Sequence, residues 1–258
     1  MYLAELTYKV IADTSFSQAE AAIRNFSEAL IFNGNILGRE FPTAWQQDRF
    51  CCRLVIPSPE ALHRSTLSAR VLQAEQQLMS AGLAYPQIQV LGMDIMSQHS
   101  SEQLAEKLVL FTTFSDNCSP LRNLADLAPV PLYQLQPAEG VDHESLIRWQ
   151  IQFQALDEVQ QQQRRVLQKT AENSLQQFNS ALNRQGRQLA KKISQHNALP
   201  VYYALYSGSS NNCSAETAKR CPGCGAAWRL TTPLLELFDF KCDSCLLVGN
   251  IAWECQTP

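Results

Sequence analysis

Two Cys-x2-Cys pairs near the C-terminus constrain the fold of this chain more than any other feature. They are Cys221-Pro222-Gly223-Cys224 and Cys242-Asp243-Ser244-Cys245, and seventeen residues separate them. A two-residue spacer lets a tight turn aim both thiolates at one point, and two such turns complete a tetrahedral all-sulfur zinc site. Four thiolates close the coordination shell. We therefore expect one structural Zn²⁺, held by Cys221, Cys224, Cys242 and Cys245, rather than a catalytic ion.

The residues around the two pairs predict a zinc ribbon. Gly225 follows the first pair directly and suits a left-handed backbone. Segments 227–231, 237–240 and 246–253 have the composition of strands. Four unrelated buried thiols are the alternative, which the spacing disfavours. We expect metal loss to unfold the ribbon, because so small a segment has too little core to fold alone, and we expect the body before Ser207 to survive a chelator.

The first ninety-five residues predict an α+β domain. Strands are expected at 2–11, 36–41, 49–56 and 87–91, with one helix opened by a Ser17 capping box and another by Ser58-Pro59. The order β-α-β-β-α-β points to a ferredoxin-like sandwich over residues 1–95, in which two helices cover one antiparallel sheet. Both enzymes and binding modules have that fold, so the fold does not indicate a function.

The middle region, residues 96–206, is also expected to be α+β. Apolar residues at helical spacing predict a long helix over 142–197, with a break near 160–165 and a second soft point at Gly186. Segment 207–219 is rich in serine and asparagine and predicts a flexible linker. The zinc ribbon at 220–258 is therefore expected to be a separate module.

The charges of the chain are unevenly distributed. Its net charge is −3, which gives no global attraction to nucleic acid. Between Gln160 and His196, however, one acidic residue, Glu172, stands against seven basic residues: Arg164, Arg165, Lys169, Arg184, Arg187, Lys191 and Lys192. Such segregation is the electrostatic footprint of a nucleic-acid surface. The alternative is a solvated helix face whose cations pair with acids elsewhere in the chain.

The remaining cysteines and the N-terminus bear on the compartment. The five cysteines outside the two pairs are scattered, which suits a reducing cytoplasm better than a disulfide framework: Cys51, Cys52, Cys118, Cys213 and Cys255. The sequence has no run of eighteen apolar residues, so we expect no membrane-spanning helix. Charged residues near the N-terminus argue against a signal peptide. We expect a cytoplasmic protein. Cys118 could recruit His143 or His196 as a base, but a loop thiol without chemistry is the favoured interpretation.

Four motifs occur together in this chain: Ser119-Pro120-Leu121-Arg122, Pro129-Val130-Pro131-Leu132-Tyr133, the stretch from Pro200 to Tyr206, and the ribbon's Cys-Pro-Gly-Cys-Gly with the stretch from Phe238 to Cys245. In this combination the chain from residue 107 to Trp253 resembles a bacterial family of uncharacterised proteins described as zinc-ribbon-containing and as candidates for nucleic-acid binding. Some of that family carry another cysteine pair after the Ser-Pro-Leu-Arg motif. Asn123 and Asp126 stand there in this chain, so the resemblance implies no second metal site and no established activity.

Two function hypotheses follow. The first is a cytoplasmic zinc-ribbon protein that binds nucleic acid through the seven basic residues. Trp228, Phe238 and Trp253 would stack on bases if exposed, with burial in the ribbon core as the alternative. The second is a protein-interaction module with a purely structural zinc. An enzyme is less favoured, because no paired carboxylates, phosphate loop or nucleophile–base arrangement stands out. The sequence leaves self-association open.

Overall fold

The chain contains two structural units, which we describe separately. The computed structural model describes residues 1–101, 105–162, 165–210 and 212–256. Unit 1 comprises Met1–Glu102, Asn117–Ser119 and Ala128–Glu144, and unit 2 comprises Gln103–Asp116, Pro120–Leu127 and Ser145–Pro258. The chain thus crosses between the units several times, whereas the sequence predicts one boundary near residue 95. Segment 128–144 belongs to unit 1 because its end is bound there: the His143 amide donates to the Phe32 carbonyl at 2.7 Å.

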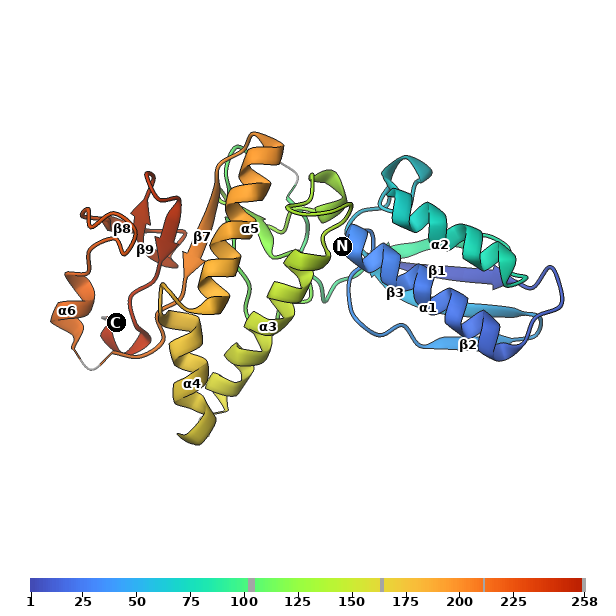
Figure 1. Ribbon diagram of the computed structural model, residues 1–258, viewed down its shortest axis with the longest axis horizontal. Helices are drawn as coiled ribbons and strands as arrows, with labels where there is room; N and C mark the ends of the chain where they lie inside the picture. The colour runs from blue at the N-terminus through green and yellow to red at the C-terminus, as the bar shows by residue number, and fades with distance from the viewer. Residues whose placement is uncertain (102–104, 163–164, 211, 257–258) are drawn as a thin grey trace. The chain divides into compact units, whose positions relative to one another are not determined.

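Unit 1 is built on one antiparallel sheet, covered by two helices (Figure 1). Its strands run in the order β2-β3-β1-β4, and its elements are β1 (Tyr2–Lys9), α1 (Phe16–Asn33), β2 (Thr43–Gln46), β3 (Arg49–Ile56), α2 (Ala69–Ser80) and β4 (Gln87–Met93). Alternate residues of β1, such as Leu6 and Tyr8, are buried against apolar residues of α1, such as Phe26 and Leu30. The order of strands and helices is the one that the sequence predicts.

The predicted boundaries in unit 1 differ from the observed ones in three places. Ser15, and not Ser17, caps α1. Ser68, and not Ser58, caps α2. In both helices the observed cap is the serine whose hydroxyl accepts the backbone amide three residues further on. The second strand is β2 rather than the predicted segment 36–41, which makes an isolated bridge to β3.

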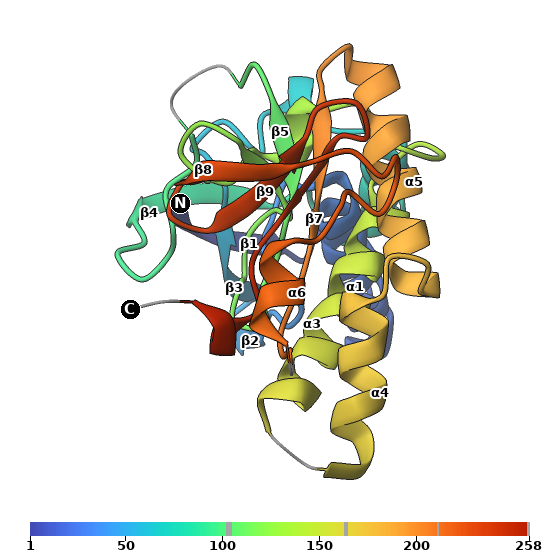
Figure 2. The same ribbon diagram turned by 90° about the vertical axis from the view of Figure 1, so that its left-hand side faces the viewer.

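Unit 2 is built on a six-stranded sheet whose order is β6-β5-β7-β10-β9-β8. The strands are β5 (Leu108–Leu110), β6 (Leu121–Asn123), β7 (Val201–Leu205), β8 (Arg229–Leu234), β9 (Phe238–Cys242) and β10 (Leu247–Gly249). β10 pairs antiparallel with β9 and parallel with β7, so the C-terminal strands continue the sheet of the preceding region (Figure 2). The sequence predicts these C-terminal strands to be part of a separate module. The physical reason for the difference is burial: all three residues of β10 are buried, as in an interior strand.

In segment 207–219, where the sequence predicts a flexible linker, residues 207 and 213–217 are held by specific contacts. The segment contains the short helix α6 (Cys213–Thr217). Cys213 forms a disulfide with Cys255, which corrects the expectation that all five remaining cysteines are scattered thiols. The Glu216 carboxylate is buried and accepts a hydrogen bond from the Ser207 hydroxyl at 2.7 Å. Glu216 Oε1 also accepts the Ala252 amide at 3.2 Å, so this bond and the disulfide join the segment to residues near the C-terminal end of the chain.

Three helices occupy the region where the sequence predicts one long helix over 142–197. They are α3 (Glu144–Gln161), α4 (Arg165–Gln176) and α5 (Ala181–Asn197), so the expected break near 160–165 falls between α3 and α4. The second break lies before α5, because side chains there terminate both helices. The Ser180 hydroxyl accepts the Asn183 amide at 3.1 Å, and the Asn183 side chain donates to the Leu175 carbonyl at 2.8 Å.

Gly186 lies inside α5 and does not interrupt it, contrary to the expected soft point. A Cβ at this position would collide with the Tyr203 ring of β7 and lie 2.8 Å from Trp149 Nε1 of α3. The glycine therefore allows α5 to pack closely against β7. Among the described residues, no helix has the length and hydropathy that a membrane span requires.

Candidate metal centre

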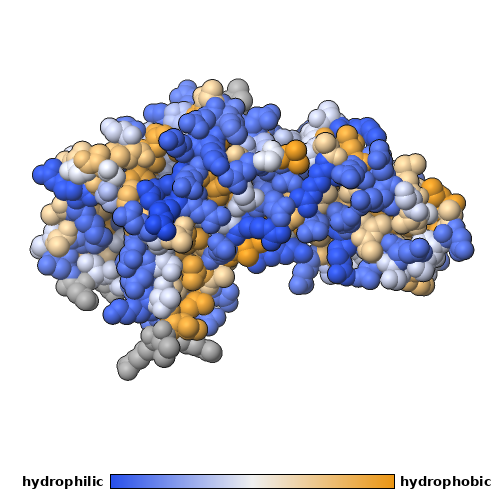
Figure 3. Space-filling model, viewed as in Figure 1, coloured by the Kyte–Doolittle hydropathy of each residue, from blue (hydrophilic) through white to orange (hydrophobic). Residues whose placement is uncertain are grey.

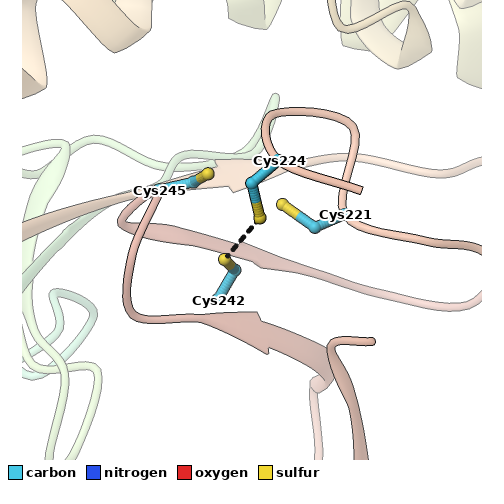
Figure 4. A group of neighbouring side chains, drawn as sticks. All are labelled: Cys221, Cys224, Cys242 and Cys245. Carbon is cyan, nitrogen blue, oxygen red and sulfur yellow. Dashed lines mark hydrogen bonds between the residues drawn. The ribbon is translucent and has the colours of Figure 1, made fainter. Parts of the chain in front are cut away.

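The four cysteines of the two pairs point toward a common centre (Figure 4). Cys221 and Cys224 come from the turn before β8, Cys242 ends β9, and Cys245 lies in the turn before β10. Their sulfur atoms all lie within 4.8 Å of one another, and the Cys224 and Cys242 sulfurs are 3.7 Å apart. A zinc ion with Zn–S bonds of about 2.3 Å has tetrahedral edges of about 3.8 Å. The arrangement therefore fits a tetrahedral four-thiolate metal ion.

Two glycines shape the first metal-binding turn. Gly225 has a φ of +75°, as the sequence predicts, and its amide donates to the Cys221 carbonyl at 2.8 Å. At Gly223 a Cβ would lie 2.8 Å from the Cys245 sulfur. A side chain at this position would push the two pairs apart, so glycine is needed for all four sulfurs to converge.

The second metal-binding turn is tied to β7. Asp243 lies directly after Cys242, and its Oδ1 accepts hydrogen bonds from the Tyr202 hydroxyl at 2.5 Å and from Lys241 Nζ at 2.6 Å. The Lys241 ammonium also lies 5.3 Å from the centre of the Tyr202 ring. These contacts lower the pKa of the Asp243 carboxyl and keep it charged. They orient the turn that carries Cys242 and Cys245.

The thiols of the cluster differ in their pKa values. A hydrogen bond from the Ala226 amide, followed by contacts with the other cysteines, lowers the pKa of Cys224 to about 7. Loss of hydration raises the pKa of Cys242, and it raises that of Cys245 to about 12. Four neighbouring thiolates repel one another, so a bound cation is what allows all four to ionise together.

The aromatic residues of the ribbon mostly build its core. Trp228 and Phe238 are buried, and Trp228 stacks on Phe240 with ring centres 4.9 Å apart. The Phe238 ring packs edge to face against the ring of Phe111, the residue after β5, with ring centres 5.8 Å apart. Trp253 differs, since 51% of its surface is exposed. Because Trp228 and Phe238 are buried, they cannot stack on bases. Their place in the core agrees with the alternative that the sequence left open.

The seven predicted nucleic-acid contacts separate into distinct groups. Arg164 lies outside the described residues, and the side chain of Arg165 is likewise not described. Arg187 is engaged within the fold, because its guanidinium donates to the Phe178 carbonyl at 2.9 Å and lies 3.4 Å from the centre of that residue's ring. Burial lowers the pKa of Arg187. Lys192 is half-buried and has an interaction partner.

Three of the seven, Lys169, Arg184 and Lys191, are exposed on α4 and α5. Within the described parts of the chain, none of these three side chains forms an ion pair. Among the described residues, the alternative in which acids elsewhere pair with the helix cations has no ion pair to support it at these three positions. The side of α5 visible in Figure 3 is mostly hydrophilic.

Two features near the four cysteines were not expected from the sequence: the Tyr202–Asp243 contact and the Cys213–Cys255 disulfide. The first has no signal in the sequence, because Tyr202 and Asp243 are 41 residues apart and meet through strand pairing. The second had one available signal: Cys213 and Cys255 flank the ribbon, one before the first ligand pair and one after the second.

Three family models match consecutive parts of the chain, and each is described as a domain of unknown function. They are DUF8589 over residues 1–92, DUF2310 over residues 102–206 and DUF8594 over residues 210–255. A solved structure from Deinococcus radiodurans, provisionally described as an antibiotic biosynthesis monooxygenase, matches 41% of this chain and 100% of its own at 13% identity. Its TM-score of 0.27 is too low to support an argument about fold or function.

Two uncharacterised proteins of Haemophilus influenzae are similar to this chain. One is 34% identical over 174 residues, covering 67% of this chain and 85% of the relative. The other is 30% identical over 260 residues, covering 98% of this chain and 99% of the relative. Because the second match spans both proteins almost completely, the chain belongs to the same family of uncharacterised bacterial proteins.

Proposed function

We propose that this protein binds one structural Zn²⁺ through Cys221, Cys224, Cys242 and Cys245. The observation that supports the proposal is the convergence of four sulfur atoms within 4.8 Å from two separate turns. All-sulfur tetrahedral sites select zinc or iron, and two knuckles on a small antiparallel sheet are typical of structural zinc. With four thiolates the shell is closed, so the ion would stabilise the fold rather than activate a water molecule.

Metal analysis of the purified protein tests this proposal. We expect one zinc per chain, lost in the double variant Cys221→Ser, Cys242→Ser. Cys51→Ser is the matched control, because Cys51 is a half-exposed cysteine of β3 and should leave the zinc content unchanged. Protein without metal, protein containing iron, or full zinc retention in the double variant would each contradict a four-cysteine zinc site.

We further propose that the protein binds nucleic acid, with Lys169, Arg184 and Lys191 contacting phosphates. Exposed cations without ion-pair partners among the described residues support this surface. Because the net charge of the whole chain is −3, electrostatic attraction to nucleic acid would come from this local group of cations and not from the protein as a whole. Fluorescence anisotropy with mixed-sequence oligonucleotides tests the proposal. We expect binding at low salt that weakens steeply as salt rises and depends little on sequence. Absence of binding at low salt would refute it.

A protein partner is the second candidate function, and exposed apolar residues of unit 1 favour it. Met93 at the end of β4 is 56% exposed, and Ile95 and Met96 in the following turn are each 88% exposed. Clustered apolar exposure of this kind marks protein contacts more often than isolated exposed residues do. Purification of the native protein with and without nuclease separates the two functions. A stoichiometric protein that remains after nuclease treatment favours this one.

Two further expectations remain proposals. The strand order β2-β3-β1-β4 with two helices on one face supports a ferredoxin-like fold for unit 1. We propose that the protein is cytoplasmic. The reducing thiol pool of the cytoplasm would favour the reduced, thiol form of Cys213 and Cys255.

A further inference from the structure

The Cys213–Cys255 disulfide links two short elements at the C-terminal end of unit 2. Cys213 begins α6, and Cys255 ends a short 3-10 turn over Trp253–Cys255. Cys213 is exposed and Cys255 is partly exposed. A small thiol or disulfide can therefore reach the bond from solvent.

Hydrogen bonds hold the two cysteines together independently of the disulfide. Glu216 lies one helical turn after Cys213, and its Oε1 accepts the Ala252 amide at 3.2 Å, three residues before Cys255. Glu216 also pairs with Lys219 through its other oxygen. The α6 helix and the C-terminal turn would thus stay in contact after reduction.

A second set of contacts fixes the C-terminal turn against the end of β7. The Ser207 amide donates to Asn250 Oδ1 at 2.9 Å, and Asn250 Nδ2 donates to the Ser207 carbonyl at 2.6 Å. The Trp253 amide donates to the Gly208 carbonyl at 3.0 Å. Since these bonds do not involve sulfur, reduced thiols at 213 and 255 would remain neighbours and could reoxidise readily.

The disulfide closes a loop that contains every proposed zinc ligand. Cys213 and Cys255 are 42 residues apart, and Cys221 to Cys245 lie between them. A cross-link restricts the unfolded ribbon, and a metal ion binds the folded ribbon. Both therefore favour the same folded state of the same segment, and each strengthens the other to the extent that the metal-free ribbon unfolds.

We propose that Cys213 and Cys255 form a reversible redox pair that is thermodynamically coupled to metal binding by the ribbon. Reduction proceeds by thiol–disulfide exchange: two molecules of a small thiol such as glutathione supply two electrons and two protons, the S–S bond becomes two Cys–SH groups, and one small-molecule disulfide forms. Oxidation is the reverse reaction. Chain entropy for a loop of this length sets the upper limit of the coupling on the order of 10³-fold.

The first experiment measures this disulfide in the full-length wild-type protein. The chain is equilibrated in glutathione buffers of graded redox ratio, with saturating zinc or with a chelator, and quenched with acid. Peptide mapping then counts the Cys213–Cys255 bond separately from bonds of the ligand cysteines. We expect zinc to make this disulfide harder to reduce by at least about tenfold, toward the limit set by loop closure.

The second experiment measures zinc affinity by competition with a chelator. Oxidised wild-type protein is compared with the variant Cys213→Ser, Cys255→Ser, in which the four ligand cysteines are intact. By reciprocity, the variant should bind zinc more weakly by the factor found in the first experiment. The first experiment uses only the wild-type protein, so it tests the coupling even if the double substitution impairs folding.

The outcomes separate this inference from the zinc proposal on which it rests. The coupling is refuted if zinc affinity is the same with and without the disulfide and if zinc does not change the glutathione equilibrium. This result would leave the zinc-site proposal intact. A protein that binds no zinc in either state overturns the zinc site and the coupling together. A bond that persists as a disulfide at cytoplasmic glutathione ratios, whatever the zinc content, overturns its reversibility.

Discussion

The Tyr202 hydroxyl donates a hydrogen bond to Asp243 Oδ1 at 2.5 Å, joining β7 to the turn that carries Cys242 and Cys245. Tyr202 and its neighbour Tyr203 point to opposite faces of the sheet. Tyr203 contacts Trp149 of α3 and donates to Asn183 of α5 at 2.6 Å. Through these two tyrosines, β7 connects the helices on one side with the metal centre on the other.

Removing the Tyr202 hydroxyl should weaken the metal centre without abolishing it. Because Asp243 is largely exposed, we expect Tyr202→Phe to lower the free energy of unfolding of unit 2 by about 1 kcal/mol. Zinc should transfer faster to a colorimetric chelator. Tyr133→Phe is the matched control, since it removes a hydroxyl contact with Ser58 in unit 1 and should leave zinc transfer unchanged. Equal transfer rates for Tyr202→Phe and wild type would show that this contact does not support the turn.

Metal removal should reach beyond the ribbon, in contrast to the expectation from sequence. Val248 of β10 and Phe238 of β9 share one apolar cluster with Val109 of β5 and with Tyr202 and Ala204 of β7. A chelator should therefore reduce hydrogen-exchange protection in β5 and β7 as well as in β8 to β10. Protection in β1 and β3 of unit 1 should not change. Loss of protection confined to residues 220–256 would instead support an independent ribbon.

Gly186→Ala should destabilise the protein although alanine favours helix. The added methyl group would collide with the Tyr203 ring and approach Trp149 Nε1, which donates to the Leu182 carbonyl at 3.2 Å. We expect overpacking to cost about 1–3 kcal/mol, outweighing a propensity gain of up to about 1 kcal/mol. Urea unfolding measures the difference. Gln185→Ala, at the exposed neighbouring position of α5, should be neutral or slightly stabilising.

Neutralising the exposed cations should flatten the salt dependence of nucleic-acid binding. The triple variant Lys169→Gln, Arg184→Gln, Lys191→Gln should reduce the slope of log K against log salt by up to about 2.7 on duplex DNA, or about 2.1 on single strands. The slope is measured by anisotropy at several salt concentrations. A variant that replaces Lys9, Arg24 and Arg39 of unit 1 with glutamine has the same net charge and is the control. Equal slopes for the two variants would exclude α4 and α5 as the binding surface.

Unit 1 should lose stability as the pH falls below about 6.5. His143 is buried, and burial lowers the pKa of its imidazole. The unfolded chain therefore binds a proton at a higher pH than the folded chain does, so stability is complete above the unfolded pKa and declines as the pH falls toward the folded pKa. One proton limits this slope to about 1.4 kcal/mol per pH unit.

The variant His143→Gln tests this titration, because glutamine retains a donor for the Leu135 carbonyl, which the histidine ring contacts at 3.2 Å. Urea unfolding between pH 7.5 and 5.5, read by pulsed hydrogen exchange in β1 and β3, should show a smaller pH dependence than wild type. A pH dependence identical to that of wild type would assign the titration to other groups.

Two features could be predicted from the sequence: the clustering of the four cysteines and the order of elements in unit 1. A Cys-x2-Cys turn is a local structure, so its spacing already specifies that Cys221 and Cys224 converge, and likewise Cys242 and Cys245. The alternation of β1 and the apolar stripe of α1 are equally local. Each of these features depends on residues a few positions apart, which is why the pattern predicts them.

How the ribbon joins the rest of unit 2 could not be predicted from the sequence, because it depends on contacts between residues far apart in the chain. The pairing of β10 with β7 and the contact of Cys213 with Cys255 each bring together residues about forty positions apart. Arg187 belongs to the basic stretch by sequence, but its guanidinium contacts the carbonyl and the ring of Phe178, a residue between α4 and α5. The strand pairing and the disulfide depend on partners that are distant in the sequence. A strand such as Leu247–Gly249 carries the same apolar residues whether it ends an isolated ribbon or fills the middle of a six-stranded sheet.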